Sequence, residues 1–287
     1  MKTSTEIYSL AKLVGYERAV ELVAKAGFDA WDLSMFEMIK YDWATRSLTT
    51  RDNPFSTGDY AGLTKKLAQI GRDNGIVCNQ SHAPFPSYAS GIMDYLKRAI
   101  ECTAIAGGEI CVIHPDNYKG AKENAEFYFE LLPFAKEYGV KIATENMFCF
   151  DKEKDIALPA ACSHHDDFLA HLEAVNDPYL VACLDIGHAA MAGLDTSPEE
   201  MIRTLGNSIE ALHVHDNDLR HDKHQIPFSM NIDFEKVIAA LKKIGYKGYI
   251  TLEADSFAKA FSADSAEECA ASLSCAARRL ADMFERA

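Results

Sequence analysis

Residues 209–218 read IEALHVHDND, and this stretch decides how the fold of the chain is interpreted. A short apolar run is typical of a buried strand. Two histidines and two aspartates follow it within six residues: His213, His215, Asp216 and Asp218. Strand alternation would turn Val214 away and leave His213 and His215 on the same side. The stretch therefore predicts a strand whose carboxyl end binds a metal, transfers protons or closes a polar turn.

Eight short apolar runs of this kind alternate with longer segments whose apolar residues recur at helical spacing. The runs lie at 6–8, 30–33, 76–79, 110–113, 140–143, 179–184, 211–214 and 249–252. Eight strand–helix pairs predict an α/β fold, a (β/α)8 TIM barrel in a single domain over residues 1–287. An open doubly wound sheet is disfavoured because YSLAKLVG (8–15) lacks the G-x-G-x-x-G turn. The longer connections 36–57 and 148–162 are expected to cross the barrel mouth.

Composition narrows the classes of partner. The formal net charge is −14, which would repel a phosphate backbone, so nucleic acid is a disfavoured partner. The first residues lack the apolar region of a signal peptide, and no stretch approaches the length of a membrane span. The eight cysteines include no C-x-x-C pair, and several lie in apolar runs. This pattern predicts buried free thiols in a reducing compartment, and we expect a cytoplasmic protein.

Residues able to bind a metal follow six successive runs, from the third to the eighth. They are His82, His114, Glu145, Asp185 with His188, His213 with His215, and Glu253. In a barrel the carboxyl ends of all strands meet around one opening, so these residues are expected to converge. Buried carboxylates there would repel one another, and a divalent cation removes that repulsion. Mixed carboxylate and imidazole ligands suit Mn²⁺, Mg²⁺, Co²⁺ or Zn²⁺, so the pattern predicts a metal centre.

Other polar residues are interpreted as structural. A single histidine at a strand end is more often hydrogen-bonded than a ligand, and only the joint pattern outweighs that interpretation. Asp222 and His224, each taken alone, are assigned to a solvated loop. His164 and His165 are assigned to the start of a helix. Asp29, Asp32 and Glu37 are assigned to turns or to the rim of the barrel.

Six motifs occur in a characteristic order. They are SHAPF (81–85), IHP (113–115), TEN (144–146), CLDIGHA (183–189), HVHDND (213–218) and LEAD (252–255). Through them the chain resembles the xylose isomerase-like barrel superfamily over nearly its whole length. Members include sugar phosphate isomerases and epimerases, ketose 3-epimerases and endonuclease IV. The resemblance implies a metal-dependent enzyme but does not name its substrate.

The sugar-acting members imply one divalent metal, with Mn²⁺ favoured over Zn²⁺, Co²⁺ or Mg²⁺. Its ligands would be Glu145, Asp185, His213 and Glu253. Both His213 and His215 fit the H-x-x-[DE] spacing of the family's histidine ligand, and the later D-x-H at 222–224 favours His213. Glu145 and Glu253 would act as base and acid in proton transfer on a small carbohydrate, through a metal-stabilised enediolate. The implied substrate contacts are His82, His114, His188, His215 and Asp151.

Two positions depart from the ketose 3-epimerases. Asp151 stands where those enzymes have a second glutamate, and Leu219 stands where they have an arginine. Both departures favour the broader class, an isomerase or epimerase of sugars or sugar phosphates. The mouth loops carry five residues expected to face the substrate: Trp43, Arg46, Arg51, Phe148 and Phe150. The sequence does not determine the oligomeric state; a homo-oligomer is one possibility, since dimers and tetramers are common among relatives.

Endonuclease IV supplies the alternative function, cleavage of abasic DNA with three zinc ions. Its nine ligand residues all have counterparts: His82, His114, Glu145, Asp185, His188, His213, Asp222, His224 and Glu253. The acidic net charge and the lack of a glycine-rich turn after 222–224 place this nuclease second. A third class, a non-catalytic sugar-binding barrel, is disfavoured because both glutamates are present.

Overall fold

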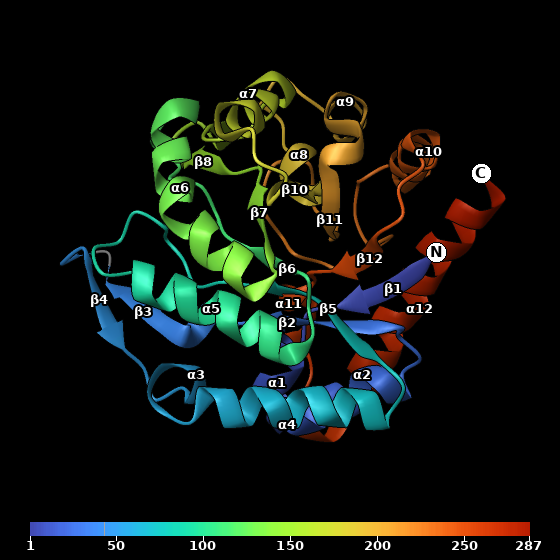
Figure 1. Ribbon diagram of the computed structural model, residues 1–287. Helices are drawn as coiled ribbons and strands as arrows, with labels where there is room; N and C mark the ends of the chain where they lie inside the picture. Colours follow the sequence, from blue (N-terminus) through green and yellow to red (C-terminus); the bar gives the residue numbers. More distant parts are fainter. Residues whose placement is uncertain (43) are drawn as a thin grey trace.

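Eight parallel strands form a ring in the structure, a computed structural model that describes residues 1–42 and 44–287 (Figure 1). Six are hydrogen-bonded in one sheet, in the order β11 (Ile209–His213), β10 (Leu180–Asp185), β7 (Lys141–Glu145), β6 (Ile110–Val112), β5 (Val77–His82) and β2 (Ala30–Ser34). The other two, β1 (Lys2–Thr5) and β12 (Tyr249–Leu252), pair with each other. Parallel bridges Glu6–Asp32 and Val214–Leu252 join the two sheets. The ring therefore closes, and the predicted (β/α)8 barrel is confirmed.

Helices cover the outside of the ring (Figure 1). They are α2 (Tyr16–Lys25), α4 (Tyr60–Asp73), α5 (Met93–Ala106), α6 (Ala121–Tyr138), α7 (His165–Val175), α9 (Pro198–Leu205), α10 (Phe234–Ile244) and α12 (Ala266–Arg286). Ser197 caps the start of α9, because its side chain accepts a hydrogen bond from Glu200 N and Pro198 occupies the first turn. The long last helix brings the chain ends together, and the Met1 amino group contacts Glu285.

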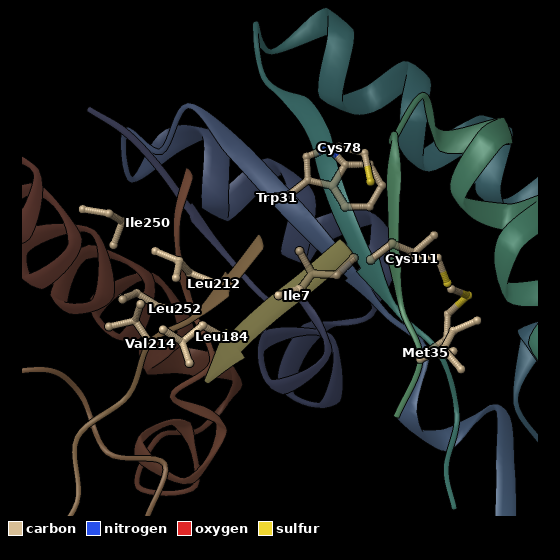
Figure 2. Packing of buried hydrophobic residues seen from close by; sticks show 14 of the residues in the cluster. Ile7, Trp31, Met35, Cys78, Cys111, Leu184, Leu212, Val214, Ile250 and Leu252 are labelled. Atoms are coloured by element: carbon tan, nitrogen blue, oxygen red, sulfur yellow. The ribbon is translucent and has the colours of Figure 1, made fainter. Parts of the chain in front are cut away.

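The main core lies between the strands and these helices. Outward-facing strand residues such as Leu184, Leu212 and Leu252 are fully buried there, and Figure 2 shows them lying together. The inside of the ring is filled by a smaller cluster: Val112, Ala143, Val181, Cys183 and Ala211. These inward residues form the floor beneath the carboxyl ends of the strands.

Replacing Leu212 with alanine should lower the free energy of unfolding by about 2–5 kcal/mol, because the side chain is fully buried in the core between strands and helices. Chemical denaturation measures the change. Leu158→Ala is the matched control, since Leu158 is 40% exposed and its loss should cost less than about 0.5 kcal/mol. Equal losses for the two variants would contradict this placement of the core.

The first strand was predicted at 6–8, and this position is wrong. β1 lies at Lys2–Thr5, Glu6 forms only a bridge, and Tyr8 begins the short helix α1 (Tyr8–Val14). The strand was missed because its buried face is polar: Ser4 Oγ donates to Asn79 Oδ1 at 2.6 Å. Hydrogen bonds replace apolar contacts at this edge of the barrel interior.

The long connections contain two hairpins that the sequence did not predict. After β2 and the short helix η1 (Phe36–Met38) come β3 (Ile39–Asp42) and β4 (Ser47–Thr50), followed by α3 (Pro54–Thr57). After β7 come β8 (Phe148–Asp151) and β9 (Ile156–Pro159). The remaining short helices are α8 (Ile186–Ala189), η2 (Gly206–Ser208), α11 (Asp255–Ala258) and η3 (Ala263–Ser265).

The predicted free thiols are confirmed. The structure leaves all eight cysteines unpaired, six of them buried, Cys149 half-buried and Cys275 exposed. Across residues 1–42 and 44–287, no helix has both the length and the apolar character needed to cross a membrane.

Candidate metal centre

The predicted site residues converge at the carboxyl end of the barrel. His82, Glu145, Asp185 and His213 are the last residues of their strands, and Glu253 directly follows β12. All five side chains are buried, with at most 8% of the surface exposed. The ring closure thus gathers residues that lie more than a hundred positions apart in the chain.

A first group of possible ligands is formed by His82, His114 and Glu145. The two Nε2 atoms of the histidines lie 2.9 Å apart, and Glu145 Oε2 lies 3.0 Å from His114 Nε2 and 3.5 Å from His82 Nε2. His82 Nδ1 lies 2.7 Å from the Ala83 carbonyl and donates to it, which leaves Nε2 as an acceptor. Two ring nitrogens this close need a proton or a cation between them.

The central group surrounds His213. Its Nδ1 lies 3.0 Å from Glu145 Oε1 and 3.4 Å from Glu253 Oε2, so one imidazole touches both glutamates. Asp185 is the register partner of His213 in the sheet. However, the imidazole that contacts the Asp185 carboxylate is that of His215, with Nε2 3.2 Å from Oδ1. The geometry therefore makes His215 as strong a ligand candidate as His213.

A third group is formed by His188, His215, Asp222 and His224. Asp222 was interpreted as a solvated loop residue when taken alone, but its Oδ2 lies 2.9 Å from His224 Nε2 and 3.5 Å from His188 Nε2. His188 and His224 each donate Nδ1–H to a backbone carbonyl, of Asn146 and Glu253 respectively, at 2.8 Å. Both Nε2 atoms consequently face Asp222, an arrangement typical of metal-binding histidines.

Glycine is required beside this third group. A side chain at Gly187 would overlap the imidazole ring of His215, so the glycine in CLDIGHA allows His215 to reach Asp185. The ring of His215 also stacks on that of His224, with centroids 4.0 Å apart.

The donor set fits a divalent cation. Buried side-chain atoms without a hydrogen-bond partner include Glu145 Oε2, Asp185 Oδ2, Asp222 Oδ1 and both ring nitrogens of His215. Burying such atoms unpaired costs free energy, and a cation coordinated by them would remove that cost. Carboxylate and imidazole donors suit the divalent ions that the sequence predicts.

The pKa values of the two glutamates, Glu145 and Glu253, are shifted in opposite directions. Burial would raise the pKa of Glu145, but the imidazoles of His213 and His114 outweigh it and hold that pKa well below its usual range. Burial is the stronger effect on Glu253 and raises its pKa. Burial also lowers the pKa of His188, yet Asp185 and Asp222 more than offset this and raise it to about 10. Without a metal, protonated imidazoles supply the positive charge that the carboxylates need.

Two buried acids in this region were missed by the sequence analysis. Asp32 was interpreted as a turn or rim residue, but its side chain is 1% exposed and its Oδ2 lies 3.8 Å from His213 Nε2. Ser34 Oγ lies 3.4 Å from Asp32 Oδ1 and 3.4 Å from Glu6 Oε2, linking the two acids. The sequence did contain a signal for Asp32, because it is a charged residue inside the apolar strand β2, which reads AWDLS.

Asp32→Asn should weaken divalent metal binding by about 10–100-fold, because the Asp32 carboxylate lies 3.8 Å from the far nitrogen of His213 and its charge favours the ring orientation that turns Nδ1 toward the glutamates. Competition with a metal-sensitive dye measures the affinity. Asp29→Asn is the control, since Asp29 precedes the same strand and pairs with Arg278 at 2.9 Å. Wild-type affinity in Asp32→Asn would show that the ring does not need this partner.

Glu6 should make the stability of the metal-free protein depend on pH. Burial is the main cause that raises its pKa to about 8, from 4.5 in the unfolded chain. Between these values the unfolded chain binds fewer protons, so the free energy of unfolding should fall as pH rises, on the order of 1 kcal/mol per pH unit. Urea denaturation at about pH 5 and about pH 8 measures the slope. Glu6→Gln should reduce it, whereas a control at the exposed Glu130 should not.

The remaining predicted residues lie outside these groups or at their edge. Asp151 accepts hydrogen bonds from Glu153 N and Lys154 N in the β8–β9 turn, which occupies its carboxylate within the hairpin. Phe148 packs edge-on against His188, with ring centroids 5.0 Å apart, and Phe150 lies 5.5 Å from the ring of His221.

The loop after β2 contributes less to the centre. Arg51 pairs with Glu37 at 2.5 Å, and Arg46 lies in the β3–β4 turn with a φ of 52°. Trp43 lies outside the described residues. His164 caps the start of α7, as the sequence predicts.

The chain belongs to the xylose isomerase-like TIM barrel family, whose sequence profile matches residues 20–279. A relative, an uncharacterized protein of Methanocaldococcus jannaschii, is 28% identical over 253 residues, which cover 82% of this chain and 78% of that protein. The fold is similar to that of a D-tagatose 3-epimerase-like protein, with a TM-score of 0.70 and 22% identity over 100% of this chain and 99% of that one. It is also similar to the IOLI protein with a binding zinc atom, with a TM-score of 0.68 and 18% identity over 100% and 99% of the two chains.

Proposed function

We propose that this protein is a divalent-metal-dependent isomerase or epimerase of sugars or sugar phosphates. One observation carries the proposal: a single imidazole, His213, touches two buried glutamates whose pKa values are shifted in opposite directions. Opposed shifts in a carboxylate pair are the arrangement that proton transfer needs, with one group as base and the other as acid. The family and the epimerase-like structural neighbour support the same class.

Two glutamates would transfer the proton, and four side chains would hold the metal. Glu145, with the lower pKa, would take the proton from the carbon beside the carbonyl, and Glu253, with the higher pKa, would return a proton. We assign the metal to Glu145, Asp185, His213 and Glu253, with His215 as an alternative histidine ligand through its contact with Asp185. When bound, the metal supplies Lewis-acid stabilisation of the negative charge that develops on the substrate oxygen.

Neighbouring side chains would position the substrate and exclude water. Phe36 packs edge-on against His82 at 4.6 Å between ring centroids, and Phe85 stacks on His114 at 5.1 Å. Phe148 borders His188 on the side of β8. Aromatic rings on both sides of the centre lower the local dielectric constant, which strengthens the charge interactions that stabilise the transition state.

A panel of sugars and sugar phosphates tests the proposal. The protein is incubated with each compound and Mn²⁺ in deuterated water, and NMR detects exchange of a carbon-bound proton. Exchange and interconversion of one ketose or aldose pair is the expected result. No exchange with any member of the panel, by a protein shown to hold metal, would contradict the proposed class.

The third ligand group, formed by His188, His215, Asp222 and His224, supports a second candidate function, that of a multinuclear metal-dependent phosphodiesterase. His188 and His224 both direct Nε2 at Asp222, so a further ion would fit beside the central one. The acidic chain, with a net charge of −14, still disfavours nucleic acid as the substrate. Nicking of a duplex with one abasic site, together with the number of metal ions per chain, distinguishes the two functions.

A further inference from the structure

A cysteine forms part of the floor of the metal centre. Cys183 lies on β10, inside the ring, and is fully buried. In the sheet it is the register partner of Glu145 on one side and of Ala211 on the other. Its Sγ, a carboxylate oxygen of Glu145 and a ring nitrogen of His213 all lie within 4.8 Å of one another. A thiol therefore stands beneath two residues assigned to the proposed metal.

We propose that Cys183, Glu145 and His213 form a deeper cation position, an alternative to the central one, for a thiophilic divalent ion such as Zn²⁺ or Cd²⁺. Thiolate, imidazole and carboxylate are each zinc ligands, and thiolate strongly favours soft ions over Mn²⁺ or Mg²⁺. On binding, the S–H bond breaks and a metal–sulfur bond forms, while the proton passes to the solvent buffer. The oxidation states of sulfur and metal do not change.

The burial of the ligands and the contact between them support this cation position. Glu145 and His213 side chains are each 1% exposed, so an ion there would be almost fully enclosed by protein. Glu145 Oε1 lies 3.0 Å from His213 Nδ1, so the carboxylate and the imidazole are already in contact beside the thiol. The inference depends on the ligand atoms alone and holds whichever reaction the protein catalyses.

The two cation positions share ligands, and this has a consequence for metal selectivity. Glu145 and His213 belong both to the deeper position and to the set proposed for the central ion. An ion held by Cys183 therefore takes ligands from the central one, so the positions should exclude each other. Zinc or cadmium should displace Mn²⁺ from the protein rather than fill a further vacant site.

Cadmium titration tests the deeper position, because cadmium bound to a thiolate absorbs in the ultraviolet. One cadmium–thiolate band per chain is expected in the wild-type protein, with loss of bound Mn²⁺ detected by electron paramagnetic resonance. Cys183→Ser should abolish the band and still bind Mn²⁺. The controls Cys111→Ser, a buried thiol elsewhere, and Cys275→Ser, an exposed thiol, should keep the band.

Two results would overturn the proposal: a band that persists in Cys183→Ser, or its absence from the wild-type protein saturated with cadmium. If Cys183→Ser does not fold, cadmium NMR on the wild-type protein replaces it. A resonance in the range of cadmium bound by one sulfur is expected, accompanied by release of about one proton per ion at a pH below the thiol pKa. A resonance typical of oxygen and nitrogen ligands alone would count against the proposal.

Discussion

Glu145→Gln should reduce kcat by about 10²–10⁴-fold on the true substrate, the range that a positioned general acid or base contributes. Glutamine keeps the shape of the side chain but can neither accept the proton nor supply negative charge. Glu145 contacts His114 and His213 at 3.0 Å, so the substitution also removes the charge that these imidazoles balance. Metal binding should weaken but persist in part, because Asp185 and Glu253 remain.

Two further variants make this result interpretable. Glu253→Gln should cause a loss of similar size, since it removes the proton donor. Glu210→Gln, in which the altered residue pairs with Lys141 at 2.6 Å away from the centre, should keep normal activity. Activity near the wild-type level in Glu145→Gln, measured on protein that is folded and loaded with metal, would exclude the paired-glutamate mechanism.

Removing the metal should abolish activity and destabilise the barrel. Glu145, Asp185 and Glu253 are buried side by side at the strand ends, and without a cation their charges are balanced only by protons on neighbouring imidazoles. An ion that binds only the folded state adds about 2.7 kcal/mol of stability when its concentration is 100-fold above Kd. Chelation followed by thermal unfolding should therefore lower Tm, and added Mn²⁺ should restore both Tm and turnover.

A second ion, Ca²⁺, is the control for this experiment. Ca²⁺, which prefers more oxygen ligands and larger sites, should restore Tm less well than Mn²⁺ does. A chelated protein that contains no metal by elemental analysis but still turns over substrate would contradict the proposed role of the ion.

The sequence predicts most of the barrel because apolar strands leave a strong signal. β10 and β11 are buried along almost their whole length, and their runs were recognised from composition alone. β1 was not, because its buried face consists of serine and threonine held by hydrogen bonds. The two hairpins were missed because short antiparallel strands over the mouth have little apolar surface to bury.

For the site, the sequence predicts which residues converge but not how they group. His213 and His215 differ by one strand repeat, and only side-chain geometry shows that one faces the glutamates and the other Asp185. Asp222 alone reads as a solvated residue because His224 is in the same polar loop and the other partner, His188, lies far away in the sequence, in α8. Asp32 and Cys183 lie inside strands, where a sequence pattern does not show which face of the ring they occupy.

Exchange with solvent deuterium is the most direct test of the central claim, that a metal-bound pair of glutamates moves a proton at carbon. The manganese-loaded protein, in deuterated water with its substrate identified from the panel, should place deuterium on one carbon beside the carbonyl, and Glu145→Gln should not. Interconversion of substrate and product without any incorporation, at early times and in several buffers, would contradict the account, because it would require transfer that never exchanges with solvent.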